Sequence, residues 1–168
     1  MQNIKLSTIT FVKKYIIMNF EDLKPKVVAI IKNNSRERDQ KLQEICQLLN
    51  QSISHYNWVG FYFANHDSQT LHLGPYVGAQ TDHTTIPFGK GICGQVAVSN
   101  ENFVVPDVAE QDNYIACSFT VKAEIVVPLF VNNINIGQID IDSHELNPFN
   151  EKDERFLEYV NLQVAALF

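Results

Sequence analysis

The feature that most constrains the fold is a pair of apolar segments joined by a two-residue turn. Residues 124–131 and 134–143 are rich in β-branched side chains, and Asn132 and Asn133 between them suit the positive φ angles of a tight hairpin. In the second segment the alternation shifts by one residue: Ile134 and Ile136 occupy even positions, whereas the later isoleucines occupy odd ones. A bulge near Gly137 explains that change. The chain is therefore predicted to contain an antiparallel sheet.

The remaining pattern places helices at both ends of the chain. Apolar side chains recur at helical spacing over residues 20–31 and 36–53, and again after Asn150, which is expected to cap the last helix with Asp153. Other elements are predicted from composition: strands at 58–63, 71–77 and 102–106, a short helix at 95–99, and loops at 78–85 and 107–120. This order predicts an α+β fold, an antiparallel sheet with its helices, including the N- and C-terminal ones, gathered on one face.

Size and charge limit the class of protein. The 168 residues, 45% of them hydrophobic, are enough for one domain, which we place at residues 18–168, with 1–17 as an N-terminal extension that need not belong to the fold. The net charge of -6 disfavours binding to nucleic acids and to anionic membranes. No apolar run is long enough to span a bilayer and no cleavage site is recognisable, so we expect a cytoplasmic protein.

Three cysteines, an odd number, favour free or redox-active thiols over a disulfide framework. Cys46 lies on the apolar stripe of a predicted helix and is expected to be a buried small hydrophobe. Cys93 lies in a glycine-rich stretch, residues 87–95, which leads into a helix whose dipole favours a thiolate. Cys117 lies in the long loop. A thiol at a helix start and another on a loop suit nucleophile-and-resolver chemistry, although spacing alone does not bring them together.

Two groups of residues are candidates for a binding site. Alternation along a strand puts Trp58 and Tyr62 on either side of Gly60, which makes either a pocket or part of an ordinary aromatic core. Asp140 and Asp142 share a strand face with Gln138, and Glu124 opens the paired strand. The carboxylates form either a solvated outer face or an acidic cluster that attracts an ammonium group and holds one carboxyl protonated near neutrality. The five histidines show no metal-ligand spacing, so no metal site is predicted.

Six segments combine Trp, Tyr, Cys and acidic residues in a specific order. They read NWVGFY at 57–62, LGPY at 73–76, IPFGKGICG at 86–94, DNYIAC at 112–117, SFTVKAEIVVPL at 118–129 and GQIDIDS at 137–143. Together they resemble the GAF-domain free methionine-(R)-sulfoxide reductases, from residue 57 to the final helix. The resemblance implies a GAF fold, a homodimer, and binding of free methionine sulfoxide rather than of the oxidised residue within a protein.

The resemblance also implies roles for the residues of both groups. Trp58 and Tyr62 would enclose the methyl sulfoxide end of the substrate. Glu124, Asp140 and Asp142 would bind its ammonium group and assist protonation of the sulfoxide oxygen. No metal or organic cofactor is implied.

The same resemblance assigns the thiols. Cys117 matches the nucleophile, which would become a sulfenic acid, and Cys93 is the internal resolver that would form a disulfide for thioredoxin to reduce. The family usually has a further cysteine three residues before its Ile-Pro pair, and here that position is His83. His83 would either act as a modulator that lowers the pKa of a thiol or mark a subgroup that kept the pocket and lost turnover.

Two other readings fit parts of this pattern. A GAF sensor module that binds an amino acid or another small ligand without chemistry would retain the aromatic and acidic residues and lack a thiol. A dimerisation domain acting through its terminal helices would need no ligand at all.

Overall fold

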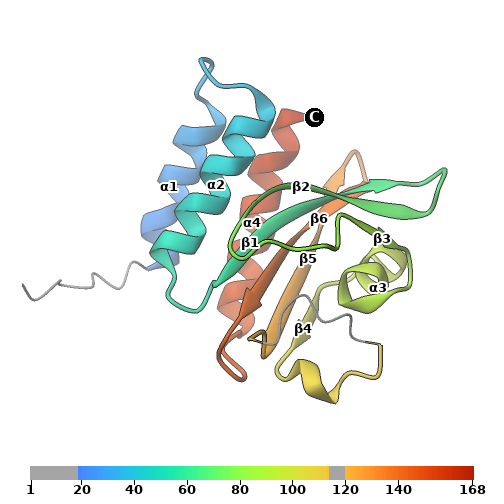
Figure 1. Ribbon diagram of the computed structural model, residues 1–168. Coiled ribbons are helices and arrows are strands. Elements are labelled where there is room, and N and C mark those ends of the chain that lie inside the picture. Colours follow the sequence, from blue (N-terminus) through green and yellow to red (C-terminus); the bar gives the residue numbers. More distant parts are fainter. Residues whose placement is uncertain (1–18, 114–119) are drawn as a thin grey trace, which may run out of the picture.

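The computed structural model describes residues 19–113 and 120–168, and within them the chain forms a six-stranded antiparallel sheet with helices on both faces (Figure 1). The helices are α1 (Phe20–Ile31), α2 (Arg38–Ser52), α3 (Gly91–Ser99) and α4 (Glu151–Val164), with short 3-10 turns η1 (Val108–Glu110) and η2 (Ala165–Leu167). The strands are β1 (Trp58–Asn65), β2 (Thr70–Val77), β3 (Thr85–Pro87), β4 (Phe103–Val105), β5 (Ala123–Val131) and β6 (Ile134–Ser143). Their order across the sheet is β3-β2-β1-β6-β5-β4.

The main core lies between the sheet and the helices α1, α2 and α4. Alternate residues of the central strands, including Val59, Ile125 and Ile139, pack there against helix residues such as Leu42 and Leu157. The N- and C-terminal helices therefore share one face of the sheet, as predicted, and α1 also contacts α4. The predicted α+β fold is confirmed.

Helix α3 is the exception, because it covers the opposite face of the sheet. Its residues Ile92, Val96 and Ala97 form a second apolar cluster with Val126 of β5 and Tyr62 of β1. The central strands present apolar groups on both faces, so one helical layer leaves half of them uncovered. This second face holds the candidate site.

The β5–β6 hairpin shows the predicted turn and bulge. Asn132 and Asn133 have φ angles of 51° and 63°, which is the conformation of a tight primed turn. The pairing shifts register so that Leu129 lies opposite Gly137 and the next residue opposite Asn135. Beyond this bulge Ile139 and Ile141 turn into the main core, and the aspartates between and after them turn toward α3.

Two short elements differ from the predictions. No strand was predicted between the loop at 78–85 and the glycine-rich stretch, yet β3 pairs with β2 at the sheet edge. It ends at Pro87, where a missing N–H costs no ladder bond. Helix α3 begins at Gly91 rather than at Gln95. Glycine disfavours helix, but the burial of Ile92 and Cys93 against the sheet extends the helix by a turn.

The first turn of α4 is fixed to the segment that precedes β1 by Asp153, which is fully buried. One carboxylate oxygen accepts hydrogen bonds from the Tyr56 hydroxyl at 3.0 Å and lies 3.1 Å from His55 Nε2, and the other accepts the Asn150 N–H at 3.0 Å. The capping box predicted for Asn150 and Asp153 is confirmed. The same carboxylate thus joins the helix cap to the strand entry.

We therefore expect Asp153→Ala to lower the free energy of unfolding by roughly 2–4 kcal/mol, since it leaves a buried hydroxyl and a helix end without partners. Urea denaturation measures the loss. Lys152→Ala in the same turn is the control, because Lys152 is exposed, and it should change stability by less than about 0.5 kcal/mol. An equal effect of the two substitutions would contradict this role of Asp153.

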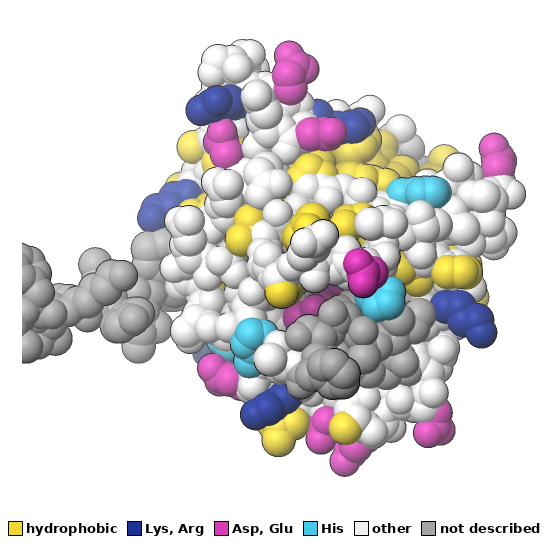
Figure 2. Space-filling view, viewed as in Figure 1, with side chains coloured by type: hydrophobic (Ala, Val, Ile, Leu, Met, Phe, Trp, Pro, Cys, Tyr) yellow, Lys and Arg dark blue, Asp and Glu magenta, His cyan; other side chains and the backbone are white. Residues whose placement is uncertain are grey.

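The predicted extension at residues 1–17 lies outside the described residues, and the domain boundary at residue 18 stays a prediction. No helix in the described ranges is long and apolar enough to cross a membrane. On the face shown in Figure 2, the described Lys and Arg side chains are scattered among acidic ones rather than gathered into one patch.

Candidate active site

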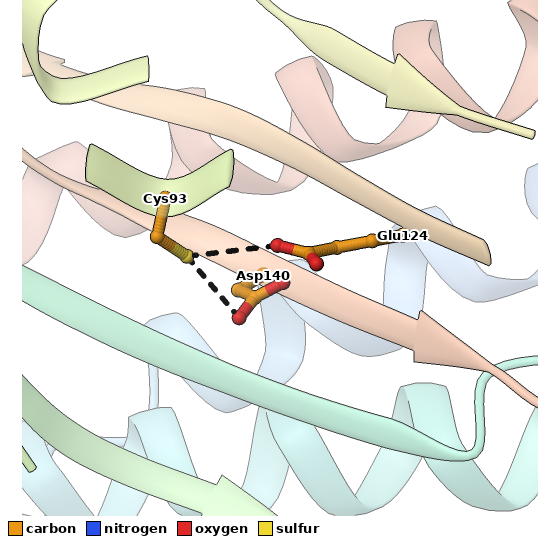
Figure 3. A group of neighbouring side chains, drawn as sticks. All are labelled: Cys93, Glu124 and Asp140. Atoms are coloured by element: carbon orange, nitrogen blue, oxygen red, sulfur yellow. Dashed lines mark hydrogen bonds between the residues drawn. The ribbon is translucent and has the colours of Figure 1, made fainter. Parts of the chain in front are cut away.

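Three carboxylates converge on the sheet face that α3 covers. Asp142 is the pairing partner of Glu124 across β5 and β6, and Asp140 lies two residues before Asp142 on the same side of β6. Their exposed fractions are 5% for Glu124 and 3% for each aspartate, so the solvated outer face considered from sequence is excluded. Helix α3 directs Cys93 at the group: its Sγ lies 3.3 Å from Asp140 Oδ2 and 3.9 Å from Glu124 Oε1 (Figure 3).

Burial raises the pKa of all three carboxyls. Desolvation raises the pKa of Asp140 to about 7, although the hydrogen bond from Cys93 opposes this shift. The pKa of Glu124 rises well above its usual range through desolvation and then through the charges of Asp140 and Asp142. Desolvation, and then the charge of Asp140, raise the pKa of Asp142 well above its usual range. A cation placed here would favour the ionised forms.

Several polar atoms in this site have no hydrogen-bond partner in the described part of the chain. They are Oδ1 of Asp140, Oδ1 of Asp142 and both amide atoms of Gln138. Leaving buried polar groups unpaired costs about 1–3 kcal/mol each. The site is therefore suited to receive a ligand that donates several hydrogen bonds.

The raised pKa values predict an unusual dependence of stability on pH. An aspartate titrates ordinarily at 3.8, whereas Asp140 titrates at about 7, so between these values the folded state holds a proton that the unfolded chain releases. The free energy of unfolding should therefore fall as pH rises through this window. Urea unfolding at about pH 5 and about pH 7.5 measures the fall. Asp140→Asn should reduce it, and an equal fall in both proteins would contradict the assignment.

An aromatic wall stands beside the carboxylates. The Trp58 indole stacks on Tyr76 at 5.3 Å and on Tyr62 at 6.3 Å between ring centroids. Its N–H donates to the carbonyl of Ala79 at 3.1 Å, which satisfies the polar end of the ring. Tyr76 was not singled out from sequence as a site residue; its position opposite Gly60 in the β1–β2 pairing is the reason it reaches the indole.

The gap expected above Gly60 is filled by that indole. A Cβ at Gly60 would lie 2.2 Å from Trp58 Cη2, so the ring lies directly over the glycine. A pocket of about 10 Å³ remains between β3, α3 and the carboxylates, and its walls include His83, Lys90 and Ile92. That is about the volume of one ordered water, so these side chains must move apart to admit an amino acid.

Comparison with known proteins decides the family. The family model described as GAF domain matches residues 35–168. This chain belongs to the GAF-domain family. Among its GAF-domain relatives, the free methionine-R-sulfoxide reductase of Escherichia coli is 38% identical over 120 residues, which cover 71% of each chain. GAF domain-containing protein A of Dictyostelium discoideum is 33% identical over 138 residues, 82% of this chain and 85% of that protein.

A solved structure agrees with these matches. The free methionine-R-sulfoxide reductase of Neisseria meningitidis, in complex with its substrate, superposes with a TM-score of 0.83 at 32% identity, over 89% of this chain and 87% of that chain. The resemblance found in the sequence is thereby confirmed at the level of family and fold.

The thiols of this GAF domain occupy different environments. Cys46 lies in the main core, on the other side of the sheet from the carboxylates, and burial raises the pKa of its thiol. It is the buried hydrophobe that was predicted. Cys93 faces the carboxylates. Cys117, the predicted nucleophile, lies outside the described residues, so its relation to Cys93 stays a prediction.

Tyr62 and His83 are joined at the edge of the site. The Tyr62 hydroxyl donates to the His83 carbonyl at 2.9 Å, and the His83 N–H donates to Thr81 Oγ1 at 3.1 Å. These bonds hold the loop between β2 and β3 against β1. The imidazole belongs to the pocket wall, and its role as a modulator stays a prediction.

Proposed function

We propose that this protein reduces free L-methionine-(R)-sulfoxide to methionine. The observation that supports this most strongly is the buried cluster of Glu124, Asp140 and Asp142, which has unpartnered oxygens and lies against Cys93 and an aromatic wall. The free methionine-R-sulfoxide reductase of Escherichia coli is 38% identical over the aligned residues, and that of Neisseria meningitidis shares the fold. A free amino acid brings an ammonium group that a buried carboxylate cluster can pair with, whereas a residue inside a protein chain does not.

The proposed binding mode divides the substrate between the two halves of the site. The ammonium group pairs with Glu124 and Asp142, because opposite charge in a buried site favours their ionised forms. The methyl group lies against the faces of Trp58 and Tyr62, where apolar contact replaces water. Asp140, with a pKa of about 7, holds a proton for part of the time at neutral pH and donates it to the sulfoxide oxygen.

The proposed chemistry passes the sulfoxide oxygen to a thiol. The Cys117 thiolate attacks the protonated sulfoxide sulfur, and the oxygen leaves sulfur and ends on Cys117 as a sulfenic acid, so methionine is released. Cys93 then attacks that sulfur, a disulfide forms and water departs. The thiols of thioredoxin reduce the disulfide and restore both cysteines.

Thiol variants test this sequence. With dithiothreitol, Cys117→Ser should release no methionine, whereas Cys93→Ser should turn over with dithiothreitol and lose turnover with thioredoxin and its reductase. Cys46→Ala is the matched control and should keep both activities, because Cys46 lies in the main core. Unchanged turnover in Cys117→Ser would refute the proposed nucleophile.

The alternative is a GAF sensor module that binds an amino acid or another small ligand and does no chemistry. His83 favours it, because it stands where the resemblance expects a further cysteine. A relative named GAF domain-containing protein A also matches most of this chain. A module of this kind would be stabilised against heat by methionine sulfoxide through mass action, with no methionine released. A homodimer is proposed for either function.

A further inference from the structure

Cys93, Glu124 and Asp140 place three potential metal-ligand atoms within 4.8 Å of one another, and all three side chains are buried. They come from α3, β5 and β6 and point toward one centre (Figure 3). In a tetrahedral zinc site, Zn–S bonds of about 2.3 Å and Zn–O bonds of about 2.1 Å put sulfur and oxygen about 3.6 Å apart. The two S···O distances here, 3.3 Å and 3.9 Å, lie on either side of that value.

Charge also favours a divalent cation at this point. Ionising one thiol and two carboxyls places three negative charges in a buried space, and Asp142 adds a fourth close by. A bound divalent ion would balance two of these four charges, and its binding would release protons from the ligands.

The choice of ion follows from the donor atoms. A thiolate ligand selects a soft or borderline ion such as Zn²⁺, whereas Mg²⁺ and Ca²⁺ prefer sites made of oxygen alone. Oδ1 of Asp140 has no hydrogen-bond partner in the described ranges, so the carboxylate can reorient toward an ion without breaking a bond there. Cys93, Glu124 and Asp140 line a small pocket that His83 also lines, so an imidazole or a water there would complete a tetrahedral set.

We propose that Cys93, Glu124 and Asp140 form an inhibitory Zn²⁺ site. The ion uses Glu124 and Asp140, which the proposed substrate needs, and it holds the thiolate that the proposed disulfide needs. Zinc and methionine sulfoxide therefore exclude each other. The histidine and cysteine spacing in the sequence did not predict the site, because its ligands come from three segments far apart in the chain.

Metal binding can be measured without any sulfoxide, so its outcome is separate from that of the proposed function. The reduced, metal-free full-length protein is titrated with Zn²⁺ against a chromophoric chelator. We expect one equivalent per chain, unaffected by millimolar Mg²⁺, and an affinity at least about 100-fold weaker in Cys93→Ser and Asp140→Asn. Cys46→Ala and Cys117→Ser should bind as the unmodified protein does.

Cobalt gives a second measurement, because a Co²⁺–thiolate bond produces a charge-transfer band in the near ultraviolet. That band should appear in the unmodified protein and vanish in Cys93→Ser, whose fold is checked by its thermal transition. Equal zinc affinity in Cys93→Ser and the unmodified protein would overturn the proposal. Loss of binding in Cys117→Ser with retention in Cys93→Ser would also overturn it, since the thiol ligand would then be another one.

Discussion

Asp140→Asn is expected to lower kcat/KM for reduction of free methionine-(R)-sulfoxide by about 10²–10⁴-fold, the usual contribution of a general acid. Asparagine has nearly the same shape, but it neither carries the negative charge nor gives up a proton. Asp140 has a pKa of about 7, which is well suited to donate a proton near neutral pH. Steady-state kinetics over a range of pH would show the loss together with a changed pH profile.

Asp82→Asn is the control for this prediction. Asp82 is exposed and adjoins His83 at the edge of the site, so it reports on surface charge without touching the carboxylate cluster, and its kcat/KM should change by less than about twofold. Unfolding does not explain a loss in Asp140→Asn, because removing a buried charge should make the protein more stable above pH 7. Asp140→Asn with nearly full activity and the original pH profile would exclude it as the proton donor.

Gly137→Ala is expected to destabilise the protein by roughly 3–5 kcal/mol, since overpacking and backbone strain each cost about 1–3 kcal/mol. The φ angle of Gly137 is 158°, and a Cβ there would lie 2.2 Å from the Tyr62 carbonyl oxygen and 3.0 Å from the Phe63 Cα. Both contacts are with the β1 backbone, so the strands β1 and β6 must separate. A thermal transition lowered by about 10 °C or more is the expected measurement.

Gly89→Ala separates the close contact from the general cost of replacing a glycine. Gly89 has a φ of 80°, yet a Cβ there would meet no atom within 4 Å. Gly89→Ala should therefore lower the free energy of unfolding only by the cost of holding alanine in the left-handed conformation, about 1–2 kcal/mol. If Gly137→Ala were no more destabilising than Gly89→Ala, the bulge would not be the close contact described above.

The parts of the fold that follow from local pattern were predictable. Apolar spacing located α1, α2 and α4, and the alternation of β6 with its phase change located both the bulge and the two faces of the strand. That bulge turns Asp140 and Asp142 to one side and Ile139 to the other. Strand alternation was therefore enough to identify the acidic residues as a group.

The parts that depend on packing between distant segments were not predictable. Strand alternation predicted the face of β1 on which Trp58 lies. It did not predict the rotamer, which places the indole over Gly60 and against Tyr76. Nothing local to α3 indicates that it covers the second face of the sheet and directs Cys93 at Asp140. Because α3 buries the carboxylates, the sequence could not distinguish a buried acidic cluster from a solvated face.

The most direct test of the proposed function is methionine release by the purified, reduced protein from free methionine sulfoxide, with the (R) and (S) epimers assayed separately and dithiothreitol as reductant. We expect repeated turnover of the (R) epimer and none of the (S) epimer. No release from either epimer by a folded protein, together with thermal stabilisation by the (R) epimer, would contradict the enzyme and leave a binding module.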